Sequence, residues 1–253
     1  MTATLNGKVA LVTGSSRGIG RAIAVRLAGL GALVCVHYGS NRAAADETVA
    51  EIAKNGGKAF AIGADLKKVA EIKNLFASLD KELATRGLSG LDILVNNAGI
   101  GGPGGIGDVS EELFDKLIDT NVKGLFFATQ EGVKRMRDGG RIINVSSMVS
   151  ITYYQNVIAY ALTKGAVNVM TRNLAAELGP RGICVNALAP GATRTEFSGS
   201  AMAPEVEKMI SGITALRRIG EPDDIAGVAA FLAGPDGGWI TGQLIVASGG
   251  MNL

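Results

Sequence analysis

Two side chains that are four residues apart could carry out a proton transfer. Tyr160 and Lys164 fall in residues 159–178, whose pattern predicts a long helix, and this spacing places both side chains on one helical face. A tyrosine phenol titrates at a pKa of about 10, and a nearby ammonium stabilises the phenolate and lowers that pKa. The pair could then exchange a proton with a carbonyl oxygen near neutral pH. As an isolated pattern, Tyr-x-x-x-Lys is also common as a surface pair.

Two serines could supply a hydroxyl to the same chemistry. Ser146 and Ser147 directly follow residues 141–145, a short apolar run that predicts a strand. A serine hydroxyl at the end of a strand can donate a hydrogen bond to a carbonyl oxygen and polarise the carbonyl. These positions therefore place two hydroxyl groups at the end of a strand, where a parallel sheet binds its ligands.

Other chemistries lack their residues. His37 is the sole histidine, so a Ser-His-Asp hydrolase has no base near the serines, and with only Cys35 and Cys184 we expect no zinc site. The two cysteines lie far apart in apolar runs, which favours buried thiols in a reducing compartment over a disulfide. Cytoplasmic localisation is therefore the default expectation.

Charge and hydropathy exclude several classes of partner. Lys plus Arg total 25 and Asp plus Glu total 23, for a net charge of +2, which gives no electrostatic footprint for nucleic acid or an anionic membrane. No apolar stretch reaches the length of about 18 residues that a membrane span needs. Residues 1–6 have neither a charged region nor an apolar one, so we expect no secretory signal.

A glycine-rich turn stands near the start of the chain. Residues 13–20 read Thr-Gly-Ser-Ser-Arg-Gly-Ile-Gly and lie between a predicted strand and a predicted helix. Glycines there allow a tight turn and let the backbone approach a pyrophosphate, which would sit on the helix N-terminus. The alternative is an ordinary glycine-rich connection, but its place between strand and helix favours a dinucleotide.

Short apolar strands alternate with longer helical patterns along the whole chain. Such strands are buried on both faces, and the crossover helices between them make the sheet parallel. We expect one doubly wound, Rossmann-type α/β domain over residues 1–253, with about seven strands, helices on both faces and ligands beyond the carboxyl ends of the strands. The expected strands are 8–12, 33–37, 59–62, 93–95, 141–145, 184–188 and 244–246, and the expected helices are 18–28, 42–55, 67–85, 110–120, 122–137, 159–178 and 223–232.

Four motifs in this order resemble the short-chain dehydrogenase/reductase family, and the resemblance runs essentially end to end. They are the glycine pattern of residues 13–20, Asn-Asn-Ala-Gly at 96–99, Tyr160-x-x-x-Lys164, and Pro-Gly at 190–191. The resemblance implies an oxidoreductase that moves a hydride between a nicotinamide and a carbonyl or alcohol. In this context the positive ring of an oxidised nicotinamide would also lower the pKa of Tyr160.

The resemblance also assigns roles to individual residues. The family's catalytic serine lies 13 residues before the tyrosine, which selects Ser147 and leaves Ser146 structural. Asn121 corresponds to the family's helix-interrupting asparagine, which supports a water linked to the lysine; the alternative is a helix cap. Asp65 corresponds to an adenine contact; the alternative is an N-cap. The expected catalytic residues are Asn121, Ser147, Tyr160 and Lys164, and the expected cofactor contacts are Gly14, Ser16, Arg17, Gly18, Ile19, Gly20, Tyr38, Ser40, Asn41, Arg42, Asp65, Leu66, Asn97, Ala98, Gly99, Pro190, Gly191, Thr193 and Thr195.

The end of the second predicted strand bears on the choice of nicotinamide. An acidic residue there would bind the ribose hydroxyls and favour NAD, but residues 36–42 contain none. Arg17 and Arg42 could instead bind a 2′-phosphate with forked, charged donors. We therefore predict NADP, the alternative being that both arginines are solvated surface charges.

The substrate stays open at this stage. The pattern is most similar to 3-ketoacyl-(acyl carrier protein) reductases, in which Lys134 and Arg181 would fall near basic docking positions, and to reductases of free ketones, sugars or secondary alcohols. A non-catalytic NADP-sensing protein is the alternative from another class. For Tyr153 and Tyr154, substrate contact and packing in the pocket wall are equally supported alternatives. Arg194 has no assigned role. Residues 194–216 are the least regular segment and a candidate substrate lid.

The chain also carries more apolar helix surface than one sheet face can cover. The predicted helices 122–137 and 159–178 are rich in small and apolar residues, and residues 247–253 directly follow the last strand. Members of the resembled family pack these regions across two-fold axes. We predict a homotetramer, with a dimer as the fallback.

Overall fold

Seven short strands form one parallel sheet in the computed structural model, which describes residues 5–195 and 203–252. The order of the strands is β3-β2-β1-β4-β5-β6-β7, and every neighbouring pair runs parallel. The fold class expected from the sequence is therefore confirmed. The strands are β1 (Val9–Val12), β2 (Leu33–Tyr38), β3 (Lys58–Gly63), β4 (Leu91–Asn96), β5 (Met136–Val145), β6 (Cys184–Pro190) and β7 (Leu244–Ala247).

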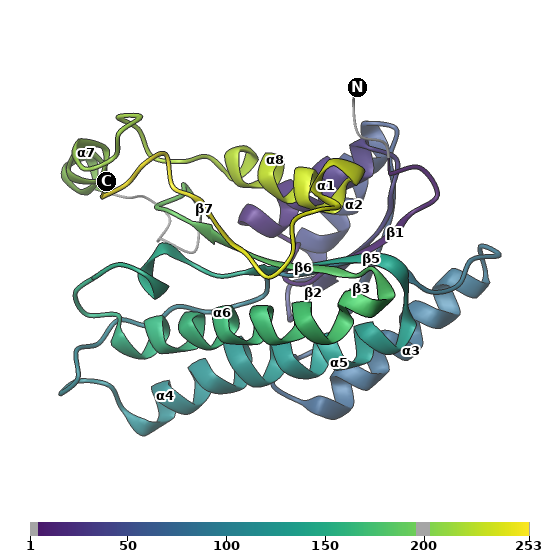
Figure 1. Ribbon diagram of the computed structural model, residues 1–253, viewed down its shortest axis with the longest axis horizontal. Helices are drawn as coiled ribbons and strands as arrows, with labels where there is room; N and C mark the ends of the chain where they lie inside the picture. The colour runs from purple at the N-terminus through teal and green to yellow at the C-terminus, as the bar shows by residue number, and fades with distance from the viewer. Residues whose placement is uncertain (1–4, 196–202, 253) are drawn as a thin grey trace.

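Helices cover both faces of the sheet (Figure 1). One layer contains α1 (Gly18–Gly29), α2 (Arg42–Lys54) and α8 (Pro222–Ala233), and the other contains α3 (Val69–Ala84), α4 (Glu111–Ile118), α5 (Leu125–Arg135) and α6 (Ile158–Leu178). Short 3₁₀ turns occupy Met148–Ser150, Gly179–Arg181 and Pro235–Gly237. None of the helices in the described ranges is long and apolar enough to cross a membrane.

Successive strand residues pack into opposite cores, because side chains alternate between the two faces of a sheet. Val12 and Val34 belong to the core beneath α1 and α8, whereas Leu11 and Cys35 belong to the core beneath α3, α5 and α6. Both faces of β1 and β2 are therefore apolar, which explains why these strands show no polar alternation in the sequence.

Two connections differ from the sequence prediction. The predicted helices 110–120 and 122–137 are joined by a π-helical turn, Asp119–Gly124, and β5 already begins at Met136. Within residues 194–216, predicted as the least regular segment, Pro204–Gly212 form helix α7. Its signals were present, because Pro204 occupies the first turn and Glu205 and Glu207 follow it. Residues 196–202 of that segment lie outside the described residues.

The strand order reverses beside β1, whose neighbours are β2 and β4. The connections after β1 and β4 therefore lead to opposite faces, and a crevice opens beyond their carboxyl ends. The site described below lies in this crevice.

Candidate active site

The turn after β1 is shaped by glycines that other residues could not replace. Gly14 has a φ of +63° and Gly18 a φ of +54°, a left-handed backbone that favours glycine. A Cβ on Gly14 would lie 2.8 Å from the Cα of Ala98, and a Cβ on Gly20 would lie 2.4 Å from Asn97 Nδ2. Glycine at these positions lets the turn close onto the loop that follows β4.

Hydrogen bonds join these two loops. Thr13 Oγ1 accepts from the backbone N–H groups of Asn97 and Ala98, both at 3.0 Å. In return Asn97 Nδ2 donates to the carbonyl oxygens of Thr13 at 2.9 Å and Gly14 at 3.0 Å. Sequence reasoning missed Thr13, whose hydroxyl acts through partners more than 80 residues away in the chain.

The first turn of α1 is suited to an anion. Arg17 is the N-cap residue, its side chain makes no capping bond, and the first turn contains no acidic residue. The N–H groups of a helix start carry a partial positive charge and need acceptors. Together with the glycines, this geometry fits a pyrophosphate.

His37 anchors the same loop from beneath. The backbone N–H of Gly14 donates to His37 Nδ1 at 3.0 Å, so the proton of the neutral ring is on Nε2, which donates to the carbonyl oxygen of Ala64 at 3.1 Å. Burial lowers the pKa of His37 to about 4, although the bond to Ala64 opposes this shift. The sole histidine is therefore a neutral part of the loop's support.

The adenosine end of the crevice gathers polar and basic residues, but not all those expected. Arg42 does not line it; this side chain is exposed, and its Nε lies 3.4 Å from Asp46 Oδ2. Tyr38 does not line it either, because its ring packs against Gly63. Lys67, which was not expected, does line it. The expected residues found there are Ser16, Arg17, Ser40, Asn41, Asp65 and Leu66.

Asp65 is not the N-cap of a helix. Its Oδ1 accepts from the backbone N–H of Lys67 at 3.1 Å, whereas α3 starts at Val69 with Lys68 as its N-cap. Asp65 Oδ2 also lies 3.7 Å and 3.8 Å from the ammonium groups of Lys67 and Lys68. The carboxylate therefore holds the turn after β3 and faces the crevice.

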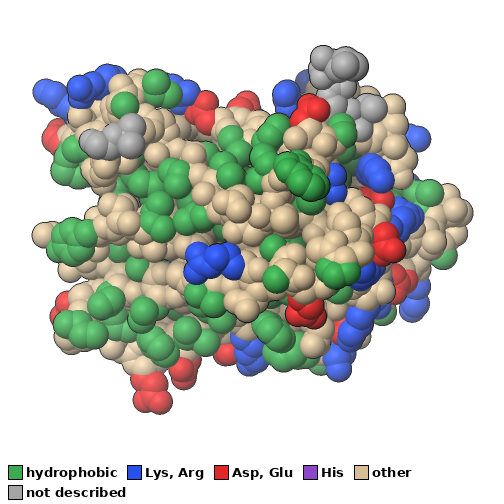
Figure 2. Space-filling view, viewed as in Figure 1, with side chains coloured by type: hydrophobic (Ala, Val, Ile, Leu, Met, Phe, Trp, Pro, Cys, Tyr) green, Lys and Arg blue, Asp and Glu red, His purple; other side chains and the backbone are tan. Residues whose placement is uncertain are grey.

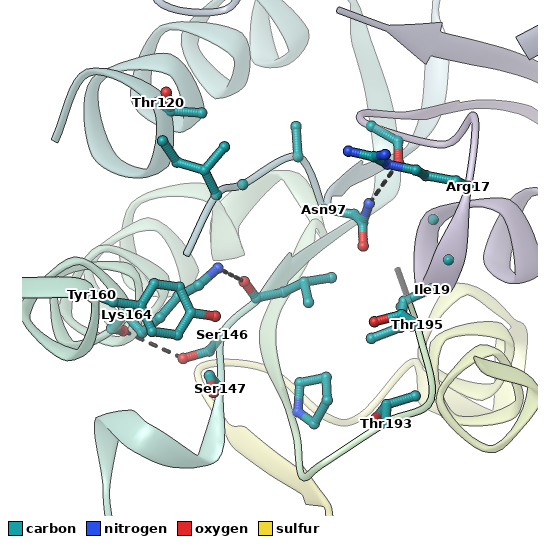
Figure 3. Close-up of a pocket in the computed structure, with 18 of the residues that line it drawn as sticks. Arg17, Ile19, Asn97, Thr120, Ser146, Ser147, Tyr160, Lys164, Thr193 and Thr195 are labelled. Atoms are coloured by element: carbon teal, nitrogen blue, oxygen red, sulfur yellow. Dashed lines mark hydrogen bonds between the residues drawn. The ribbon is translucent and has the colours of Figure 1, made fainter. Parts of the chain in front are cut away.

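Tyr160, Lys164 and Ser147 meet at the other end of the crevice (Figure 3). Tyr160 and Lys164 lie on α6, and the Lys164 Nζ is 5.7 Å from the centre of the Tyr160 ring. Nζ donates to the carbonyl oxygen of Val145 at 2.8 Å, which fixes the ammonium beneath the ring. Ser147 follows β5 and hydrogen-bonds Tyr160.

Burial sets the pKa values of this pair. It raises the pKa of Tyr160 to about 12, against a lowering by the bond from Ser147, and it lowers the pKa of Lys164 to about 8. The sequence predicted that the ammonium of Lys164 and the ring of an oxidised nicotinamide together lower this pKa; in the protein without that ring, burial raises it. Tyr160 is held protonated at neutral pH, which suits a proton donor.

Asn121 lies in the π-helical turn rather than at a helix cap. Its Oδ1 accepts from the N–H of Ile100, and its Nδ2 donates to the carbonyl oxygen of Ile100, both at 2.8 Å, and to Thr163 Oγ1 at 3.1 Å. Asn121 does not line the crevice but ties the loop after β4 to α6. A Cβ on Gly99 would lie 3.2 Å from Asn121 Oδ1 and 3.6 Å from Lys164 Nζ, so both side chains flank this glycine.

Ser146 has structural partners. Its hydroxyl donates to Asn168 Oδ1 at 2.6 Å and lies 3.3 Å from the carbonyl oxygen of Lys164. Ser146 borders the crevice, but these bonds hold the end of β5 against α6.

An apolar wall stands beside the tyrosine. Tyr154 lines the crevice and donates to Met251 Sδ at 3.1 Å, whereas Tyr153 is 79% exposed and does not line it. Burial raises the pKa of Tyr154. Sequence reasoning missed Met251, which no motif marks. The wall consists of Met148, Val149, Tyr154, Ile210 and Met251.

One continuous cavity of about 860 Å³ contains both ends. Between the phosphate loop and Tyr160 it is lined by Asn97, Ala98, Gly99, Pro190, Gly191, Thr193 and Thr195, together with Gly14, Gly18, Ile19 and Gly20. Within the described residues no cluster of His, Cys, Asp and Glu could hold a metal ion. The fold and the cavity are those of a dinucleotide-binding protein, with a buried tyrosine beside a serine and a lysine at the far end of the cavity.

Comparisons with known proteins identify its family. The family model described as enoyl-(acyl carrier protein) reductase matches residues 14–252. An uncharacterised oxidoreductase of Methylorubrum extorquens is 45% identical over 249 residues, which cover 98% of each chain. The hydroxynaphthalene reductase-like protein Arp2 of Metarhizium brunneum is 40% identical over 260 residues, covering 98% of this chain and 96% of the relative.

Solved structures agree with these matches. The promiscuous reductase LugOII, which catalyses keto-reduction at C1 during lugdunomycin biosynthesis, superposes with a TM-score of 0.95 at 47% identity, over 99% of this chain and all of the other. The landomycin C-6 ketoreductase LanV, with bound NADP and rabelomycin, gives 0.92 at 43% identity, over 99% and 98%. The chain belongs to the short-chain dehydrogenase/reductase family and is an oxidoreductase.

Proposed function

We propose that this protein uses NADPH to reduce a ketone on a free, largely apolar small molecule. The observation that carries the proposal is the single cavity in which a phosphate-binding loop, a buried tyrosine acid and an apolar wall are continuous. The reverse reaction, oxidation of the corresponding alcohol, uses the same groups.

The residues of the cavity fit a dinucleotide. The uncapped N-terminus of α1 and the close-packed Gly14 and Gly20 would hold the pyrophosphate, and Asp65 would accept from the adenine amino group. Thr193 and Thr195 would face the carboxamide and a phosphate. When bound, a reduced nicotinamide supplies the hydride that the protein itself lacks.

The cationic residues at the adenosine end favour NADP over NAD. Arg17 and Lys67 line the cavity there, Ser40 and Asn41 add neutral donors, and β2 ends without an acid. Arg42 has a weaker claim to the 2′-phosphate because it is paired with Asp46 outside the cavity. NADP is also the cofactor bound in the LanV structures.

The protein groups act on the carbonyl oxygen. Ser147 donates a hydrogen bond that polarises the carbonyl, and Tyr160 transfers its proton to the oxygen as negative charge develops there. Lys164, with a pKa of about 8, can exchange a proton near neutral pH and limits the charge left on the phenolate. Asn121 holds the loop that flanks Lys164 and, as in the resembled family, would support a water leading to solvent.

A carrier-protein substrate has less support than a free ketone. Lys134 Nζ is paired with Glu131 at 2.7 Å, and Arg181 Nε is paired with Asp138 at 2.9 Å. Arg181 also donates to the carbonyl oxygens of Val133 and Met136, so an acidic partner would have to compete with acceptors that both basic side chains already have. The ketoreductase relatives LugOII and LanV favour a free ketone, and the hydroxynaphthalene reductase-like relative favours one on a fused aromatic ring, which the apolar wall suits.

The assembly that fits the surface is a homotetramer, with a dimer as fallback. Figure 2 shows hydrophobic side chains at several places on this face of the molecule. On α5 and α6, Phe126, Ile158, Leu162 and Val169 are exposed, and Trp239, near the C-terminal strand, is 99% exposed. Repeated contacts around two-fold axes would bury both patches. Cytoplasmic localisation is supported by the buried free thiols of Cys35 and Cys184.

The test is ketone reduction by purified protein and by Tyr160→Phe. A panel of a polycyclic aromatic ketone, a small diketone and a β-ketoacyl thioester is assayed with NADPH in single turnovers. We expect the aromatic ketone to be reduced, and Tyr160→Phe to lower kcat about 10²–10⁴-fold with NADPH binding retained. Retention of more than about a tenth of kcat would rule out the acid role, and bound NADPH with no reduction would favour a sensing protein.

A further inference from the structure

Arg194 joins three segments that are separate in the sequence. It stands between Thr193 and Thr195, both of which line the cavity. Its backbone N–H donates to the carbonyl oxygen of Gly220 at 2.8 Å, and the N–H of Gly220 donates to Ala192 at 3.0 Å. The backbone of Arg194 is therefore fixed against the segment that leads into α8.

The side chain of Arg194 reaches the helix α7. Nη2 and Nη1 lie 2.6 Å and 3.2 Å from the two carboxylate oxygens of Glu207, and Nε lies 3.1 Å from Glu221 Oε1. Such a forked arginine–carboxylate pair restricts orientation as well as distance. The pairing lowers the pKa of Glu207.

The helix α7 contributes to the apolar wall. Ile210, one turn after Glu207, lines the cavity. Beyond α7 the chain pairs with the C-terminal residues: Ala215 and Leu216 donate to the carbonyl oxygens of Gly250 and Gly249 at 3.1 Å and 3.0 Å, and Asn252 donates to Ile213 at 2.9 Å. The helix α7 and the C-terminus accordingly lie side by side (Figure 1).

These backbone hydrogen bonds link Ile210 to the other side of the apolar wall. Met251, which also lines the cavity, lies within the paired C-terminal segment and accepts from Tyr154. Ile210 and Met251 therefore belong to one unit, made of α7 and residues 249–252. This unit is joined to residues 190–195, which line the cofactor part of the cavity, by one described ion pair, that between Arg194 and Glu207.

We propose that Arg194 is a positioning residue, whose ion pair with Glu207 holds α7 and the Ile210–Met251 wall at the substrate end of the cavity. The role rests on the proposed ketone reduction. Arg194 touches neither the reacting atoms nor, through its side chain, the cavity. Its loss should therefore weaken the binding of the ketone and leave the proton transfer by Tyr160 intact.

The variants Arg194→Gln, Glu207→Gln and the double variant test this role. We expect each single variant to raise KM for the ketone about two- to fivefold, the range of one well-formed exposed ion pair, with kcat, the Kd for NADPH and Tm near the wild-type values. The double variant should be no worse than either single one. About 0.5 M salt should bring the wild type close to the variants, and Arg194→Lys should restore part of the loss.

Arg218→Gln is the matched control, because Arg218 makes an equally forked pair with Asp224 on α8 and does not reach α7. It should leave KM unchanged. An unchanged KM in Arg194→Gln, additive effects in the double variant, or a joint fall of kcat, NADPH affinity and Tm would overturn the proposal.

A second measurement separates this proposal from the proposed function. Hydrogen exchange of the α7 amides should be faster in Arg194→Gln than in Arg218→Gln, whatever ketone the enzyme reduces. If the wild type reduces no ketone but α7 exchange responds, the proposed function fails and the role of the ion pair stands. Equal α7 exchange in both variants would refute the ion pair's role even in an active reductase.

Discussion

Acidification below pH 6.5 should destabilise this protein through one side chain, His37. The ring is 2% exposed, accepts from Gly14 through Nδ1 and donates to Ala64 through Nε2. Protonation of Nδ1 would remove the acceptor of the Gly14 N–H and place a charge in the core. The pKa of His37 is therefore lowered from 6.5 to about 4 in the folded state.

The sign and size follow from proton linkage. Between pH 6.5 and about 4 the unfolded chain binds more protons than the folded one, so stability falls as the pH falls. One pKa unit corresponds to about 1.4 kcal/mol. The free energy of unfolding should drop by about 2 kcal/mol between about pH 7 and pH 5, and by about 3 kcal/mol once both states are protonated.

Carboxylates add to the loss only at lower pH. The pKa values of Glu71, Glu131 and Glu207 are lowered from 4.5, and that of Asp224 from 3.8 to about 2. Their stabilising contributions are present above the unfolded values and are lost below them. Because the chain has one histidine, the range from about pH 6.5 to pH 5 reports on His37 with little interference.

The assay is urea unfolding across this range for the wild type and His37→Gln. The amide of glutamine stays neutral and offers an acceptor and a donor, so its unfolding free energy should be nearly flat over the same range, even if it is lower throughout. NMR titration of the single imidazole should show no protonation above about pH 5. Equal slopes for both proteins, or an imidazole that titrates near 6.5, would refute the reasoning.

Three further outcomes are expected. Arg17→Ala combined with Arg42→Ala should weaken NADPH binding tenfold or more relative to NADH binding, since charge-assisted bonds contribute about 1.5–3 kcal/mol each. Arg17→Ala should account for most of this loss, and equal losses for both cofactors would contradict a phosphate role. Gly20→Ala should lower the stability or NADPH affinity by about 1–3 kcal/mol, because its Cβ would lie 2.4 Å from Asn97 Nδ2; unchanged Tm and Kd would contradict the close packing. Light scattering at micromolar concentration should show a tetramer, and a mass near the 25.9 kDa of one chain would exclude it.

Features fixed by local sequence could be predicted well. The buried strand β1 and the turn after it depend on apolar residues and on glycines such as Gly14 and Gly18 that need a left-handed backbone. The spacing of Tyr160 and Lys164 follows from helical geometry alone. These signals lie within a few residues of the feature that they specify, so no tertiary information is needed.

Features that depend on distant partners were missed. Thr13 acts through residues after β4, Met251 reaches the cavity only because residues 249–252 pair with the chain after α7, and α7 itself is held by Arg194. For Thr13 and Met251 the decisive contacts are distant in the sequence. Arg42, predicted to bind the 2′-phosphate, is different: it lies 3.4 Å from Asp46 on the same helix, a local contact that the sequence reasoning did not consider.

The direction of the tyrosine pKa shift is the clearest case of this limit. The sequence predicts a lowered pKa because it considers the ammonium of Lys164 and the ring of an oxidised nicotinamide, and not the water that burial removes from the two side chains. In the folded protein the Tyr160 pKa is about 12 and the Lys164 pKa about 8. A phenol with so high a pKa does not lose its proton to water at neutral pH, whereas an alkoxide oxygen, more basic still, can take that proton as it forms. Burial thus keeps Tyr160 protonated until the carbonyl oxygen gains negative charge. It also leaves beside the phenol a lysine, Lys164, that can itself exchange a proton near neutral pH.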